Sequence, residues 1–127
     1  MYESNIIKNK NISADIYSVV KDAFIMDKGY SEELSNHMSQ AVFDKINVYN
    51  VYPVNNTEYK KPYKVDFSLK ENTETLITGI LVIKMTYSVE IIDAQGTAIG
   101  GSRNIPATFT IRILGDKWYI FDENEPA

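Results

Sequence analysis

The chain is predicted to form an α+β domain in which two N-terminal helices pack on a curved antiparallel sheet of about four long strands. Apolar residues recur at three- and four-residue spacings up to residue 47, as they do in amphipathic helices. Beyond residue 62 they alternate with polar residues, as they do in strands that bury one face. The length of 127 residues and the 44% hydrophobic content indicate one domain over residues 1–127 with a core of its own.

The first helix is expected over about residues 13–27. Ser13 is a favourable N-cap, and the apolar residues that follow it form one helical face. Gly29 ends this helix, because glycine readily adopts the left-handed conformation found after helix C-termini. Residues 1–12 form a polar lead, which we expect to be flexible.

A second helix is expected from Ser31 to about residue 47. Ser31 is again a favourable N-cap, and two glutamates after it suit the positive end of the helix dipole. His37 lies at the edge of the apolar stripe of this helix, with no acid or nucleophile at helical spacing. It is therefore expected to be a packing residue rather than a catalyst. The predicted buried stripe consists of Leu34, Met38, Ala41, Val42 and Ile46.

Residues 48–62 are predicted to form a loop with at most one short strand. Two prolines and two adjacent asparagines mark turns in this segment. It carries Tyr49, Tyr52 and Tyr59, and tyrosines on a connection are typical of recognition surfaces. The alternative is that these tyrosines pack down over the helices.

The sheet is expected to begin with a strand over residues 63–70 and a turn at residues 71–74. A long strand follows over about residues 75–92, in which Gly79 offers a bend or bulge. The segment Asp93–Gly96 closes a hairpin.

The return strand runs through residues 105–113. Two adjacent glycines and Pro106 interrupt its beginning, which indicates an edge or a bulge. A tight turn at residues 114–117 leads to the last strand, residues 118–122, and an acidic tail follows at residues 123–127.

Alternation assigns the strand residues to two faces of the sheet. Tyr87 is the only inward residue with a polar tip, so the inward face holds no carboxylate for proton abstraction. Ile80 and Val82 lie on the nominally outer face, where Asp66 and Arg112 are expected to have structural pairing roles. The other residues predicted to face inward are Ile77, Leu81, Ile83, Met85, Val89, Ile91, Phe109, Ile111 and Ile113.

The order of elements resembles that of the NTF2-like (cystatin-like) superfamily. The closing segment carries the most specific likeness: a strand over residues 105–114, a Gly-Asp-Lys turn and the strand Trp-Tyr-Ile-Phe over residues 118–121. The resemblance implies a bent antiparallel sheet wrapped around helices as a cone. It also implies a wide range of functions, from isomerases and dehydratases to ligand carriers and non-catalytic assembly domains of bacterial envelope proteins.

Composition excludes several chemistries. The chain has no cysteine and one histidine, so thiol catalysis, disulfides, zinc–thiolate sites and multi-histidine metal sites cannot be built from it. It also has no phosphate-binding glycine motif, and no cofactor is implied. The net charge of −4 argues against nucleic acid as a partner.

The sequence therefore predicts a non-enzymatic protein-binding or assembly domain. A protein partner or a second copy is expected at the outer sheet face and the tyrosine loop, through Tyr49, Tyr52, Tyr59, Ile80 and Val82. The alternative is a pocket that binds or isomerises a small apolar ligand inside the cone. Its polar contacts would come from Tyr87, His37 and Tyr17.

No membrane span is expected, because no apolar run approaches the length that a spanning helix needs. Frequent lysine, isoleucine and asparagine are typical of an AT-rich genome and favour a bacterial source. A polar N-terminal lead is also what remains when a signal or anchor has been removed. The location stays open, with the cell envelope favoured over the cytoplasm.

Overall fold

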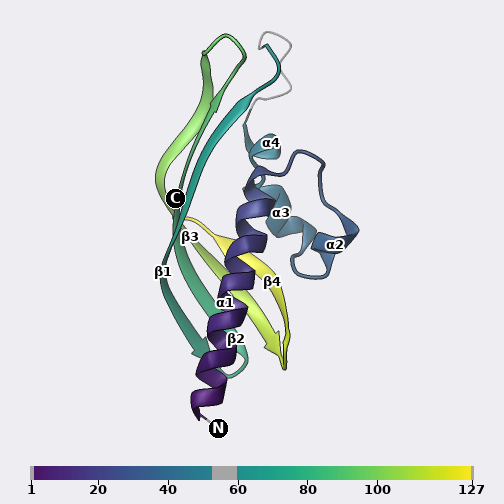
Figure 1. The fold of residues 1–127 in the computed structure, drawn as a ribbon, viewed down its shortest axis with the longest axis vertical. Helices are drawn as coiled ribbons and strands as arrows, with labels where there is room; N and C mark the ends of the chain where they lie inside the picture. The colour runs from purple at the N-terminus through teal and green to yellow at the C-terminus, as the bar shows by residue number, and fades with distance from the viewer. Residues whose placement is uncertain (1, 53–59, 127) are drawn as a thin grey trace.

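A four-stranded antiparallel sheet and a layer of helices make up the structure. The computed structural model describes residues 2–52 and 60–126. The strand order is β1–β2–β3–β4, and the helices of this part of the chain lie against one face of the sheet (Figure 1). The predicted α+β class is confirmed. We call the helix-covered face the inner face and the opposite one the outer face.

Helix α1 (Tyr2–Ile25) is longer than predicted and runs along the inner face. The flexible lead expected over residues 1–12 is helical from Tyr2 onward, because the chain has no glycine or proline before Gly29 to stop the helix. Ser13 is not an N-cap. Its hydroxyl is buried and donates to Glu74 Oε2 at 2.7 Å.

The second predicted helix is divided by the sheet. Ser31 caps its first turn as expected, accepting from Leu34 N at 3.0 Å. The segment 36–39 then leaves the helix to hydrogen-bond with the edge of β4, where Ser39 N donates to Ile120 O at 3.0 Å. Ser39 also caps the next helix. The pieces are α2 (Glu32–Ser35) and α3 (Gln40–Ile46). The loop predicted over residues 48–62 is wrong at its start, where Asn47 caps a further short helix, α4 (Val48–Val51).

The sheet differs from the prediction mainly at its first hairpin. The predicted turn at residues 71–74 is wrong: this stretch continues the first strand, with a bulge at Asn72. The chain reverses instead at Thr78 and Gly79, both at positive φ, so that Ile77 pairs with Ile80. The strands are β1 (Lys64–Ile77), β2 (Ile80–Ile92), β3 (Ala98–Leu114) and β4 (Lys117–Asn124).

The other turns lie where they were predicted. Asp93 organises the β2–β3 turn by accepting from the backbone N–H groups of Gln95 and Thr97 through Oδ1. The register of β3 against β2 shifts between Ser102 and Ile105, near the glycines that indicated a bulge.

The core fills the space between the helices and the inner face. Phe24, Met38, Phe43 and Phe109 are each at most 2% exposed. Ile77 is an exception to the predicted inward set, because the turn at Thr78–Gly79 changes its alternation and leaves it 63% exposed. Ala41 is also exposed, on the solvent side of α3. A smaller cluster of Val48, Val89, Ile91 and Ile99 extends the core beneath α4.

Candidate functional site

Apolar side chains gather on the outer face at the end of the sheet that holds the β1–β2 and β3–β4 turns. One row of paired residues crosses the sheet there and consists of Ile77, Ile80, Arg112 and Tyr119. Phe121 is the extra residue at a bulge in β4, beside this row. We define the apolar patch as Ile77, Ile80, Val82, Leu114, Tyr119 and Phe121, which surround Arg112.

The patch holds most of the exposed large apolar side chains in the described part of the chain. Ile77 is 63%, Leu114 70% and Phe121 39% exposed, and Tyr119 is also exposed. Two exposed large apolar residues lie outside the patch. Val51 is on α4, and Leu76 is near the C-terminal end of β1. A contiguous apolar surface on an otherwise solvated sheet face is typical of a binding site.

Arg112 is the charged residue at the centre of the patch. Its guanidinium carbon lies 5.5 Å from the centroid of the Phe121 ring, in a cation–π contact. Among the described residues no carboxylate forms an ion pair with it. Asp66 has the structural pairing role expected of it, since its carboxylate lies 3.6 Å from Lys64 Nζ. Arg112 pairs with the Phe121 ring and not with a carboxylate of the described residues.

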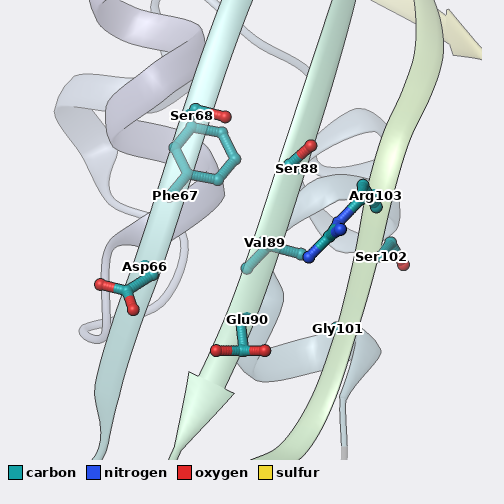
Figure 2. A pocket seen from close by; sticks show the side chains of 9 residues that line it. All are labelled: Asp66, Phe67, Ser68, Ser88, Val89, Glu90, Gly101, Ser102 and Arg103. Atoms are coloured by element: carbon teal, nitrogen blue, oxygen red, sulfur yellow. The ribbon is translucent and has the colours of Figure 1, made fainter.

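The opposite end of the outer face is polar and hollowed. A cavity of about 570 Å³ lies over the three neighbouring strands β1, β2 and β3. Figure 2 shows Arg103 reaching from β3 toward β2, with Asp66 and Glu90 on the two other strands. Gly101 allows β3 to approach β2 closely beside this hollow, because a Cβ there would lie 2.6 Å from the carbonyl oxygen of Val89. The mixed charges of this end contrast with the apolar patch.

The inner face carries a carboxyl cluster that contradicts its predicted lack of acids. Glu123, expected in the acidic tail, belongs to β4, where it pairs with Phe109 and is only 2% exposed. The carboxyl of Glu125, two residues further on, accepts from the hydroxyl of Tyr87 at 2.6 Å. Burial, with the neighbouring Glu125 carboxyl, raises the pKa of Glu123 to about 8.

The three residues named for a ligand pocket do not meet. Tyr17 donates to the carbonyl oxygen of Leu69 at 2.6 Å and lines an open cavity of about 610 Å³ between α1 and β1. His37 lies in the break between α2 and α3, stacked on Trp118 with ring centroids 4.2 Å apart. Tyr87 packs on Phe24 with ring centroids 4.7 Å apart and bonds to the chain's C-terminal segment.

A second carboxyl pair borders the Tyr17 cavity. The pKa of Glu71 is raised by burial and by the hydrogen-bonded Glu74 carboxyl, which also accepts from Ser13. Both glutamates are exposed on β1. Because Glu74 accepts a hydrogen bond from Ser13 on α1, this carboxyl pair supports the packing of α1 on the sheet.

The tyrosines of the connection are only partly available to a partner. Tyr49 and Tyr52 are half-buried against the smaller core cluster, and the Tyr52 hydroxyl lies 2.5 Å from Ser102 Oγ. Tyr59 lies outside the described residues. Of the predicted interface residues, Ile80 and Val82 thus lie in the apolar patch, whereas Tyr49 and Tyr52 are packed against the core.

No protein-family model, curated protein or solved structure matches the chain. In residues 2–52 and 60–126 no helix has both the length and the apolar composition needed to cross a bilayer. The same residues hold no group of three or more histidine, aspartate or glutamate side chains arranged to bind a metal ion.

Proposed function

We propose that the chain is a non-enzymatic assembly domain of NTF2-like architecture whose apolar patch binds another protein. The observation that carries this proposal is the set of six apolar side chains on the outer face around Arg112, which has no carboxylate partner in residues 2–52 and 60–126. The antiparallel sheet, covered by helices on one face, is compatible with the architecture. Inner-face side chains such as Ile83, Phe109 and Ile111 are at most 2% exposed, which favours a solid core over an open internal pocket.

The partner that fits the patch presents apolar side chains around a carboxylate. Covering Arg112 removes water from its guanidinium, which is unfavourable unless the partner supplies an acceptor of opposite charge. The exposed aromatic rings of Tyr119 and Phe121 supply rigid contact area of the kind that dominates binding energy. A second copy would instead bring another Arg112 to the interface, so charge complementarity favours a different protein.

Substitutions at the most exposed patch residues test this proposal. Ile77→Lys and Leu114→Lys place charges on the patch at exposed positions beside turns, where the fold tolerates them. Val51→Lys, on α4, is the matched control because its side chain is equally apolar and 51% exposed. The tagged variants are compared in the cell extract of the source organism by quantitative mass spectrometry of co-purifying proteins.

The expected result is one protein retained by the wild type and by Val51→Lys, and reduced about tenfold or more by both patch variants. Retention of every specific partner by Ile77→Lys would overturn the proposal. Sedimentation of the purified chain identifies self-association. A wild-type dimer that Leu114→Lys dissociates would show that the occupant is a second copy and would overturn the assignment of a different partner.

A further inference from the structure

The polar hollow of the outer face, the cavity of about 570 Å³ over β1, β2 and β3, is bordered by charges of both signs. Its ionisable lining residues are Asp66, Glu90 and Arg103. Lys64 Nζ lies 3.6 Å from Asp66, whereas Glu90 and Arg103 form no ion pair with each other or with any other described residue. The hollow therefore separates a carboxylate and a guanidinium that each lack an ion-pair partner in the described chain.

A bulge in β3 positions Arg103. The register of β3 against β2 shifts here, so that Ser88 on β2 faces both Arg103 and Asn104. Asn104 has a φ of 54°, and its backbone N–H donates to Ser88 Oγ at 2.9 Å, which fixes the bulge. Bulges of this kind redirect side chains and are frequent beside binding sites. Figure 2 shows the result, with Arg103 reaching toward β2.

The two carboxylates lie further along the sheet. Asp66 and Glu90 pair directly across β1 and β2, so their Cβ atoms are about 5 Å apart on the same face. Like charges in this position repel each other, and a ligand cation placed between them would reduce the repulsion. Glu90 also pairs with Gly101, which precedes Arg103 by two residues, or about 7 Å along β3. This separation suits a small molecule that carries both an ammonium and a carboxylate.

We propose that the polar hollow binds a small zwitterion of the α-amino acid class. Its ammonium contacts the carboxylates of Glu90 and Asp66, and its carboxylate accepts hydrogen bonds from the planar donors of Arg103. The Ser68 hydroxyl lines the same hollow and is available to a polar side chain of the ligand. A ligand with one charge would leave either Glu90 or Arg103 without a partner. The hollow and the apolar patch lie at opposite ends of the outer face, so the two sites are independent.

A titration of the full chain with three related compounds tests the site. L-serine carries both charges, L-serinamide lacks the carboxylate, and N-acetyl-L-serine lacks the ammonium. Binding is followed by the backbone amide signals in nuclear magnetic resonance spectra at about pH 6.5, where α-amino groups are protonated. Signals from the rest of the chain show that each variant is folded.

We expect L-serine to shift the signals of residues 88–90 and 101–103 in a saturable way. A Kd on the order of 1 mM is within reach of a ligand with so few atoms. L-serinamide and N-acetyl-L-serine should each bind about tenfold more weakly or worse, because each loses one charge-assisted contact.

Substitutions in the hollow separate the two contacts. Arg103→Gln and Glu90→Gln each remove one charge from an exposed position, and each should raise the Kd for L-serine about tenfold or more. Lys84→Gln is the control, because Lys84 is exposed on the outer face of β2 and does not line the hollow. It should leave the Kd unchanged.

Three outcomes would overturn the proposal. The first is the absence of saturable shifts at residues 88–90 and 101–103 with L-serine at about 50 mM. The second is equal binding of L-serinamide or N-acetyl-L-serine, which would show a site for a single charge. The third is a wild-type Kd for L-serine in Arg103→Gln or Glu90→Gln, because the contact assigned to that residue would then not exist.

Discussion

The guanidinium carbon of Arg112 lies 5.5 Å from the centroid of the Phe121 ring, across two neighbouring strands of the outer sheet face. This contact places the cation over an aromatic ring of the apolar patch, where no described carboxylate pairs with it. An arginine at the centre of an apolar patch favours a partner that supplies a carboxylate, because covering it without an acceptor of opposite charge is unfavourable. The contact therefore links the sheet geometry to the proposed binding function.

Reversing the charge at position 112 should weaken binding of the partner. Arg112→Glu places two carboxylates opposite each other in the interface, so we expect the Kd to rise at least about tenfold. Arg112→Lys keeps the charge and loses the planar contact with Phe121, which gives a smaller loss. Titration calorimetry with the captured partner measures both.

The matched control for this prediction is Arg103→Glu. Arg103 is exposed on the same outer face but borders the polar hollow rather than the patch. Its substitution should leave the Kd unchanged. Equal affinities for Arg112→Glu and the wild type would contradict the role given to Arg112.

Removing the hydroxyl of Tyr87 should affect stability and spare binding. Tyr87→Phe loses the hydrogen bond to Glu125 and retains the ring contacts with Phe24. We expect the free energy of unfolding to fall by about 1 kcal/mol, as is usual for one such bond. Partner affinity should stay at the wild-type value, because Tyr87 lies on the inner face. Chemical denaturation measures the change in unfolding free energy, and calorimetry measures the partner affinity. A large loss of partner affinity in Tyr87→Phe would contradict the assignment of binding to the outer face.

The buried Glu123 should make stability depend on pH. Its pKa in the folded chain is about 8, against an ordinary 4.5, so the native state binds an extra proton between these values. The free energy of unfolding therefore falls as the pH rises through this window and levels off above it. The total change is on the order of 2–4 kcal/mol.

Glu123→Gln should lack this slope and exceed the wild type in stability at about pH 9. Thermal unfolding followed by circular dichroism at several pH values gives the comparison. Parallel curves for the two proteins would show that Glu123 is ionised in the folded state and would contradict its raised pKa.

Asn47 is predicted to be the most sensitive polar residue of the helical layer. Its buried amide donates to the carbonyl oxygens of Ala23 and Met26, both at 2.8 Å, and its oxygen accepts from Tyr49 N. Asn47→Ala leaves these groups without partners, so we expect a loss of about 2–3 kcal/mol in unfolding free energy. Asn47→Asp should cost at least as much, because a carboxylate would face two carbonyl oxygens.

Asn50 offers the control for Asn47, since it is exposed on the adjacent helix. Asn50→Asp should change the unfolding free energy by less than about 0.5 kcal/mol. Urea titrations of the four proteins are sufficient. A wild-type midpoint for Asn47→Asp would refute the bridging role of this side chain.

The sequence predicted the sheet where alternation was clear and failed where strand pairing overrode a local signal. The polar stretch 71–74 is typical of a turn, yet it continues β1 because the turn at Thr78 and Gly79 pairs β1 with β2 along nearly their whole lengths. Thr78 did not indicate a turn, because a β-branched residue seldom adopts the positive φ that it has here. The break in the second helix likewise depends on a distant element, the edge of β4.

The residues of the candidate sites could likewise be predicted where local alternation was enough, and not where they depend on strand pairing. Ile80 and Val82 could be assigned to the outer face from alternation alone. Tyr119 and Phe121 join them only through the pairing of β4 with β3, which no local pattern reveals. Glu123 was expected in an exposed tail, because an acidic C-terminal run is usually solvated; its burial depends on continuing β4 beside Phe109.

Photo-crosslinking from inside the patch tests the central claim most directly. A benzoylphenylalanine in place of Phe121 keeps an aromatic ring beside Arg112, and the same residue at Val51 is the control. In cells of the source organism, we predict an adduct between position 121 and a different protein that is absent from position 51 and is lost with Arg112→Glu. No adduct at position 121, or the same adducts at both positions, would contradict the assignment of the patch as a protein-binding surface.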